Sequence, residues 1–322
     1  MARSGDLPPA AVPNEARQAG EIRGRWPWVE PAAWTERMLT ALEQGVKGGK
    51  WFSLMDKVYG ERNLRAAFAR VKANRGSAGV DHATVASFEA HLDANVARLH
   101  RSLRDGTYRP QAVRRVWIPK PGRNEKRPLG IPTVRDRVVQ TALRNVLEPI
   151  FERDFAEHSY GFRPGRGCKD ALRRLATLLR QGYVHVVDAD LKSYFDSIPP
   201  DRLMERVRTK VSDGRVLALL EAYLEAEVLD GAKAWTPDRG TPQGAVISPL
   251  LSNLYLDPLD HRMAEEGFEM IRYADDFVVV CRSEAAARRA LAVVETWTAS
   301  AGLALHPRGD HRGCQPDPAR LV

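Results

Sequence analysis

Three aspartates stand at the ends of short apolar segments, where side chains face solvent instead of a core. Asp275 and Asp276 are adjacent in a turn between two apolar runs within residues 270–281, and Asp190 ends the β-branched stretch at residues 183–190. Neighbouring carboxylates repel each other unless a cation lies between them. Because two neighbouring strands can bring their ends to one point, we expect the three aspartates to share a metal site.

The chemistry expected of such a site is phosphoryl transfer. Ligands that are all oxygen favour Mg²⁺ over zinc. Two Mg²⁺ ions about 3.5 to 4 Å apart clamp the attacking and leaving oxygens in this class of reaction. The competing explanation is that Asp275 and Asp276 form an ordinary hydrophilic turn, because Asp tolerates unusual backbone angles. For the Asp-Asp dipeptide alone the hydrophilic turn is the better explanation. The sequence around the dipeptide favours the metal site instead.

The surrounding residues resemble the motifs of reverse transcriptases. Tyr-Ala-Asp-Asp at residues 273–276 is similar to the signature hairpin of that family, and Asp-Leu-Lys-Ser-Tyr-Phe-Asp at residues 190–196 resembles its first catalytic motif. Further segments follow in the family's order and are similar to the bacterial group II intron-encoded reverse transcriptases, also called maturases. They are residues 74–81, 118–121, 126–132, 160–167, 240–244 and 248–253, and the resemblance covers roughly residues 34 to 307.

The resemblance implies a role for each matching acidic residue. Asp190, Asp275 and Asp276 would be the catalytic residues, and together with Leu191 they would be the metal-binding positions. The reaction implied is attack of a primer 3′-hydroxyl on the α-phosphate of a deoxynucleotide, with two Mg²⁺ ions as cofactors and pyrophosphate as the leaving group.

Four further residues would bind the incoming deoxynucleoside triphosphate. Phe195, five positions after Asp190, would fill the space that a ribonucleotide 2′-hydroxyl needs. Lys120 and Arg127 would supply positive charge to the triphosphate, and Gln243 would lie beneath the incoming sugar. The structural alternatives are a core phenylalanine, a solvated basic loop and a simple turn residue.

The elements that must position these residues are mostly helical, and the mixture predicts an α+β fold. The resemblance makes it a right-hand polymerase with fingers, a palm built on an antiparallel sheet, a helical N-terminal extension and no complete thumb. Periodicity predicts helices over residues 88–103, 136–147, 169–180, 201–211, 215–226 and 284–299, and strands over residues 183–190 and within 270–281. The expected domains are a disordered lead-in (1–33), the N-terminal extension (34–106), fingers (107–182), palm (183–305) and an aberrant tail (306–322).

Composition restricts the partners and the compartment. Lys and Arg number 49 against 41 Asp and Glu, which gives a net charge of +8 and favours polyanionic partners. The three cysteines form no CxxC pair, so neither a zinc site nor a disulfide framework is indicated. The sequence has no apolar run of the roughly 18 residues that a membrane helix needs. We therefore expect a cytoplasmic protein, associated with the nucleoid or a ribonucleoprotein, and no membrane partner.

The resemblance weakens at the end of the chain. Residues 302–307, Gly-Leu-Ala-Leu-His-Pro, begin a further family motif, but residues 308–314 depart from it, and no lysine follows Lys233. We therefore expect a C-terminally truncated form that lacks the thumb and any nuclease domain. The expected function is RNA-directed DNA polymerisation with an ancestral role in intron splicing and retrohoming, using an RNA template, intron RNA and a DNA primer or target. The alternatives are an inactive fragment that retains RNA binding, and a retron-like or defence-associated reverse transcriptase.

Overall fold

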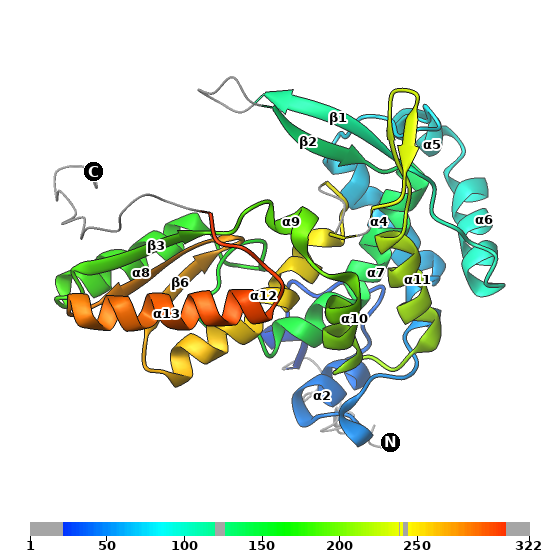
Figure 1. Cartoon of the computed structure of the whole chain (residues 1–322). Helices are drawn as coiled ribbons and strands as arrows, with labels where there is room; N and C mark the ends of the chain where they lie inside the picture. Colours follow the sequence, from blue (N-terminus) through cyan, green and yellow to red (C-terminus); the bar gives the residue numbers. More distant parts are fainter. Residues whose placement is uncertain (1–21, 120–125, 238, 241–243, 307–322) are drawn as a thin grey trace, which may run out of the picture.

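The computed structural model describes residues 22–119, 126–237, 239–240 and 244–306, which form two small sheets among many helices (Figure 1). The helices are α2 (Glu36–Gln44), α3 (Met55–Val58), α4 (Glu61–Ala73), α5 (Val85–Ala90), α6 (Leu92–Arg104), α7 (Val134–Glu152), α8 (Cys168–Arg180), α9 (Tyr194–Ser197), α10 (Pro200–Arg208), α11 (Gly214–Leu224), α12 (Ser248–Glu265) and α13 (Glu284–Ser300), with a 3₁₀ turn η1 (Lys47–Gly49). The strands are β1 (Val113–Pro119), β2 (Lys126–Ile131), β3 (His185–Asp190), β4 (Val228–Asp230), β5 (Lys233–Trp235), β6 (Glu269–Tyr273) and β7 (Asp276–Cys281). The expected α+β class is confirmed.

The first sheet is antiparallel, in the order β3-β7-β6, and lies between helices on both faces. Along β7 the side chains alternate, as they must in a strand: Phe277, Val279 and Cys281 join the main core, whereas Val278 and Val280 pack in a small second core with Leu178 of α8. Helices α12 and α13 cover the main-core face. The burial of both faces fixes the register, because a slip of one residue would exchange the two sets of side chains.

The second sheet has the order β2-β1-β4-β5 and stands at the top of the molecule in Figure 1. Strands β1 and β2 form an antiparallel hairpin, and β4 pairs in parallel with β1 before it turns into β5. Helix α9 lies between this sheet and the first one in the view of Figure 1.

Helix α7 is the most deeply buried long element of the helical body. Almost every one of its 19 residues is buried, and Thr133 caps its start by accepting a hydrogen bond from the Asp136 backbone. The polar Asn145 on α7 is satisfied inside the core: its side-chain amide donates to the Asn63 side chain at 2.8 Å, and its backbone carbonyl accepts from the Trp34 indole at 3.0 Å. These contacts fix α4 and the segment before α2 against α7.

Two sequence expectations need correction. The single helix expected over residues 88–103 is divided into α5 and α6, because His91 leaves the helical region and the Asn95 amide satisfies the freed Phe88 carbonyl at 2.9 Å. The disordered lead-in expected over residues 1–33 does not extend to its predicted end. Val29 and Ala33 are each only 2% exposed, because the short segment before α2 folds back onto the core. No helix within the described residues is long and apolar enough to cross a membrane.

Candidate active site

The three aspartates meet at one end of the β3-β7-β6 sheet. Asp190 is the last residue of β3 and stands directly opposite Asp276, the first residue of β7. Side chains opposed in this way have their Cβ atoms about 4.5 to 5.5 Å apart. Asp275 lies in the turn between β6 and β7, after Ala274, whose φ of +60° is unusual for a residue with a side chain. The juxtaposition expected from the sequence is therefore present.

The site is electrostatically strained by its own charges. Burial raises the pKa of Asp275, and the negative charges of Asp276 and Asp190 raise it further. The ionised form of Asp275 is thus held at a cost in a cluster of like charges, which is what a bound cation relieves. The donors are carboxylate oxygens, the set that suits Mg²⁺. Within the residues described here, however, no group of three or more His, Cys, Asp or Glu side chains is already arranged so that it could hold a metal ion.

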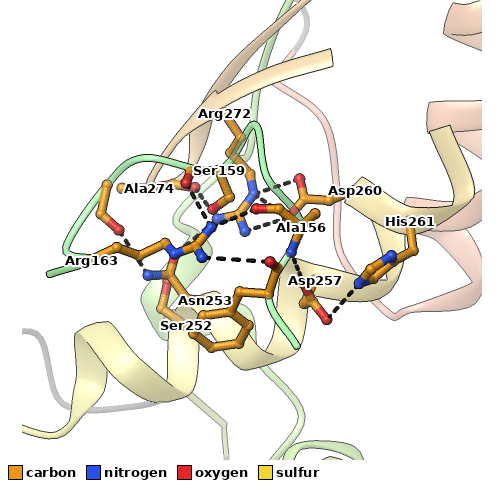
Figure 2. A network of polar contacts seen from close by, with 12 residues as sticks. Ala156, Ser159, Arg163, Ser252, Asn253, Asp257, Asp260, His261, Arg272 and Ala274 are labelled. Carbon is orange, nitrogen blue, oxygen red and sulfur yellow. Dashed lines mark hydrogen bonds and ion pairs between the residues drawn. The ribbon is translucent and has the colours of Figure 1, made fainter. Parts of the chain in front are cut away.

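A buried arginine holds the turn that carries Asp275. The Arg272 side chain is fully buried, and its guanidinium forms a two-pronged ion pair with Asp260 of α12 at 2.5 to 3.0 Å. The same guanidinium donates to the Ala274 carbonyl and to the Asn253 side chain, both at 2.9 Å (Figure 2). One side chain therefore ties the turn that carries Asp275 to α12.

The neighbouring segment at residues 158–161 holds the turn from its other side. The Arg272 backbone donates to the His158 carbonyl at 3.0 Å, and its carbonyl accepts from the Tyr160 N–H at 2.9 Å. Asn253 donates to the Gly161 carbonyl at 2.8 Å. A Cβ added at Gly161 would lie 2.3 Å from the Ala274 nitrogen, so only glycine fits this approach.

Arg163 fixes that segment to the helical body. Its guanidinium pairs with Glu152 of α7 at 2.8 to 3.0 Å and donates to the carbonyls of Ala156 and Ser159 at 2.5 and 2.8 Å. Figure 2 shows Arg163 and Arg272 converging on the same stretch of chain. The motif at residues 160–167 thus helps to hold the turn between β6 and β7, which carries Asp275, in place.

Phe195 lies on the short helix α9, directly after β3. Its ring is half-buried, packs against the main core and lies 5.5 Å from the Tyr194 ring. Tyr194 is buried, and its hydroxyl donates to the Ser252 carbonyl at 2.7 Å, so the start of α9 is anchored to α12. Ser193 has a φ of +48°, and such backbone strain is common where function constrains geometry.

The expected nucleotide-binding residues are described only in part. Arg127 is exposed on β2, opposite Ile118. Lys120 and Gln243 lie outside the described residues. The glycines on either side of Gln243 are placed: a Cβ added at Gly240 would lie 2.6 Å from the Phe195 carbonyl oxygen, and one added at Gly244 would lie 2.3 Å from the Gly130 carbonyl oxygen. The motif at residues 240–244 therefore contacts both α9 and β2.

Leu191 and the end of β3 pair with the last described residues. Leu191 is buried and forms an antiparallel bridge with Leu305, while the His306 N–H donates to the Asp190 carbonyl at 2.8 Å. Residues 304–306 thus cover the edge of β3 beside the aspartates. The motif that begins at Gly302 extends this end of the sheet.

Sequence reasoning did not identify Arg272, Asn253 or Asp260 as site residues. One signal was present, because Arg272 is a charged residue inside the apolar run that precedes the aspartates. A charge in such a position must be paired when the strand is buried. The partner could not be read from spacing, because Asp260 lies on a separate helix.

Comparison with known proteins agrees with this geometry. The β3-β7-β6 sheet is antiparallel, as the expected palm sheet is, and Asp190 and Asp276 lie at one end of it. Residues 118–308 match the family described as reverse transcriptase (RNA-dependent DNA polymerase), and this match covers more than half of the chain. The chain belongs to the reverse transcriptase family.

Two curated relatives are similar to part of this chain, and the name of the second one refers to a group II intron. Protein YkfC of Escherichia coli K12 is 41% identical over 58% of this chain and 50% of its own length. The group II intron-encoded protein LtrA of Lactococcus lactis subsp. cremoris is 37% identical over 60% of this chain and 32% of its own length. The matched region thus spans half or less of each relative. A solved chain titled as part of a partial Cas6-RT-Cas1–Cas2 complex is 24% identical, with a TM-score of 0.48 over 77% of this chain and 42% of that chain. The similarity to group II intron reverse transcriptases is confirmed.

Loss of Arg272 is expected to have two separate effects, a lower free energy of unfolding and a lower activity. Arg272→Leu leaves Asp260 buried without its partner, which typically costs about 3 to 5 kcal/mol of unfolding free energy. The double change Arg272→Leu with Asp260→Leu should recover much of that stability, because both charges are removed. It should not recover activity, because the Ala274 carbonyl loses its donor.

Denaturant unfolding and primer extension measure the two effects. Arg174→Leu is the matched control, since Arg174 pairs with Glu269 of the same strand at a partly exposed site. Its cost should stay near 1 kcal/mol or below. An active double variant would show that Arg272 does not position the turn.

Gly161→Ala is expected to lower activity. The added methyl group must displace Ala274, and a shift of about 1 Å in a catalytic group can cost about 100-fold in rate. Gly167→Ala is the control in the same segment, because the nearest atom to its Cβ is 3.8 Å away. Single-nucleotide incorporation rates of the two variants should differ strongly, and equal rates would contradict the close-approach argument.

Proposed function

We propose that this chain is an RNA-directed DNA polymerase of the group II intron type. The observation that carries the proposal is the meeting of Asp190, Asp275 and Asp276 at one sheet end, with the Asp275 turn held by a fully buried arginine. The reaction is attack of a primer 3′-hydroxyl on the α-phosphate of a deoxynucleoside triphosphate. A new phosphodiester bond forms, the bond to the β-phosphate breaks, and pyrophosphate leaves.

The three carboxylates and the backbone carbonyl of Leu191 would hold two Mg²⁺ ions. These ions would activate the hydroxyl and stabilise the leaving group. The protein's own contribution is to bring like charges together and keep them there. Arg272 fixes the turn through the Ala274 carbonyl, and Gly161 allows the neighbouring segment to approach it. This support would limit how far the turn has to move when the carboxylates take up the ions.

The nucleotide would enter between the first sheet and the β1-β2 hairpin. Phe195 would occupy the space of a 2′-hydroxyl, Arg127 and Lys120 would neutralise phosphate charge, and Gln243 would contact the sugar. Two contacts support this placement. Gly240 lies against α9, which carries Phe195, and Gly244 lies against β2, which carries Arg127, so the two ends of the motif that contains Gln243 lie beside these two residues' elements.

The remaining assignments follow from the same proposal. Residues 34–106 would be the N-terminal extension, residues 107–182 the fingers and residues 183–305 the palm. The partners would be an RNA template, intron RNA and a DNA primer or target, consistent with a net charge of +8. Such an enzyme would act in the cytoplasm, at the nucleoid or in a ribonucleoprotein.

Asp275→Asn is expected to abolish extension and to raise stability. The folded-state pKa of Asp275 is raised, so its ionised form destabilises the fold at neutral pH, and this penalty disappears below the pKa of the unfolded chain. Asn removes the charge, so the variant should unfold at a higher temperature than the parent at pH 7 without divalent metal. The difference should vanish near pH 3.

Primer extension on an RNA template with Mg²⁺ and deoxynucleotides gives the functional readout. If the parent binds RNA but extends no primer, the chain is an RNA-binding fragment instead of a polymerase. If Asp275→Asn extends at the parental rate, the carboxylate assignment is wrong.

Phe195→Ala is expected to admit ribonucleotides. Removal of the ring opens the space that a 2′-hydroxyl would occupy, so the preference for deoxynucleotides should fall, by about 10-fold or more, with deoxynucleotide incorporation reduced far less. Tyr194→Phe is the neighbouring control, because it removes only the hydroxyl that bonds the Ser252 carbonyl. Competitive incorporation of matched ribo- and deoxynucleotides measures the ratio. An unchanged ratio in Phe195→Ala would make this residue a packing residue only.

A further inference from the structure

A single buried carboxylate joins the two ends of the β1-β2 hairpin. The pairing of β1 with β2 ends at Arg114 and Ile131, and the chain continues beyond these residues to Gln111 on one side and Thr133 on the other. Both residues bond the same atom, Oδ2 of Asp136. The Gln111 backbone N–H donates to it at 3.1 Å, and the Thr133 hydroxyl donates to it at 2.7 Å. Asp136 thus closes the hairpin at its base.

Asp136 itself belongs to the helical body of the molecule. It lies in the first turn of α7 and is only 1% exposed. Its other oxygen, Oδ1, accepts a hydrogen bond from the Tyr108 hydroxyl, and that hydroxyl lies 2.7 Å from the hydroxyl of Tyr223 on α11. The carboxylate therefore connects the hairpin with two helices. We call Asp136 with its partners Gln111, Thr133 and Tyr108 the hairpin clamp.

The start of α7 does not need this carboxylate as a cap. The Thr133 side chain already caps the helix by accepting from the Asp136 backbone N–H at 3.2 Å. Burial raises the pKa of Asp136, and the bonds from Tyr108, Thr133 and the Gln111 backbone offset part of that rise. A buried charge is costly unless hydrogen bonds replace its lost water. The chain bears this cost at the one point where both ends of the hairpin meet α7.

The clamp controls the position of a residue near the far end of the hairpin. Arg127, which would neutralise phosphate charge, stands opposite Ile118 and lies four residues along β2 from Ile131. At about 3.4 Å per residue, Arg127 lies roughly 14 Å from the clamped end. A rotation of the hairpin by about 5° at its base would shift Arg127 by about 1 Å, and a shift of that size in a positioning group can cost about 100-fold in rate.

Other contacts hold mainly the inner strand of the hairpin. Strand β1 pairs with β4, and the Trp117 indole on β1 donates to the Asp230 carboxylate of β4 at 3.0 Å. Strand β2, which carries Arg127, is the edge strand in the order β2-β1-β4-β5. The clamp reaches this edge strand through Thr133 and so links it to α7 beyond the last strand pair.

We propose that Asp136 is a positioning residue for the incoming nucleotide. By tying both ends of the β1-β2 hairpin to α7, it sets the place of Arg127 relative to the three aspartates. This inference rests on the proposed function, because that function assigns Arg127 to the triphosphate. Asp136 acts through the hairpin, since its own carboxylate is buried at the hairpin's base.

Two substitutions at Asp136 separate the clamp from the negative charge. Asp136→Ala removes the acceptor of both hairpin ends, so the KM for the deoxynucleotide should rise by about 10-fold or more, with a smaller fall in kcat. Asp136→Asn keeps one side-chain oxygen that the Gln111 N–H and the Thr133 hydroxyl can reach. Its KM should stay within about threefold of the parental value.

Asp213→Ala is the matched control for the loss of a buried carboxylate. Asp213 is also buried, and it accepts from the backbone N–H groups of Leu54 and Met55 at 2.8 and 2.9 Å, but it ties that segment to α11 and not to the hairpin. Its loss should lower the free energy of unfolding as Asp136→Ala does. A loss of stability lowers the fraction of active enzyme, and therefore the apparent kcat, and should leave the KM for the deoxynucleotide unchanged.

Amide hydrogen exchange measures the clamp without any chemistry. In Asp136→Ala the amides of residues 113–119 and 126–131 should exchange about 10-fold faster than in the parent, because the base of the hairpin opens more often. Asp136→Asn and Asp213→Ala should keep parental exchange there. If Asp136→Ala does not fold, Thr133→Ala is measured in its place. Its control is Thr35→Ala, which removes only the cap of α2.

The outcomes distinguish this inference from the proposed function. A raised KM with faster hairpin exchange in Asp136→Ala, and parental values in Asp136→Asn and Asp213→Ala, supports the positioning role. A parental KM in Asp136→Ala, or an equal rise in Asp213→Ala, overturns that role while the polymerase stands. If the parent extends no primer, the proposed function fails and the exchange comparison decides: selectively faster exchange supports the clamp, and parental exchange in the hairpin overturns it.

Discussion

The pairing of Arg272 with Asp260 inside the protein is the interaction on which the site depends. A buried ion pair contributes little net stability, because the cost of removing both charges from water offsets most of their attraction. Its consequence here is geometric. The guanidinium has donors left over after pairing with Asp260, and they go to Asn253 and to the Ala274 carbonyl. The turn that carries Asp275 is thereby held in a fixed position relative to α12.

That rigid support opposes a local instability. Asp190, Asp275 and Asp276 carry like charges at one sheet end, and the raised pKa of Asp275 records the cost of holding them there. A turn free to relax would move these carboxylates apart. The positive φ of Ala274 is a second source of strain in this turn. Such strained conformations persist only where the surrounding structure holds them. Holding the three carboxylates together therefore costs this region stability.

Close backbone contacts connect this turn to the rest of the molecule. Gly161 lies against Ala274, Gly240 against Phe195 and Gly244 against Gly130, each at a distance that excludes a side chain. Gly161, Gly240 and Gly244 belong to two of the motifs on which the family resemblance rests, at residues 160–167 and 240–244. Their role in the fold is to let segments that are distant in sequence pack around the aspartates. Some of the residues that carry the family resemblance therefore serve the packing of the fold.

The sequence by itself determined the three aspartates, the strands that carry them and helix α13, because apolar periodicity and turn residues are local signals. It did not determine the break at His91, the partners of Arg272 or the burial of Val29. Each of these depends on which distant element packs against it. The contact between Trp117 and Asp230 joins residues 113 positions apart, and it exists only because β4 pairs with β1. Tertiary structure decided these features, since long-range pairing leaves no periodic trace in either segment.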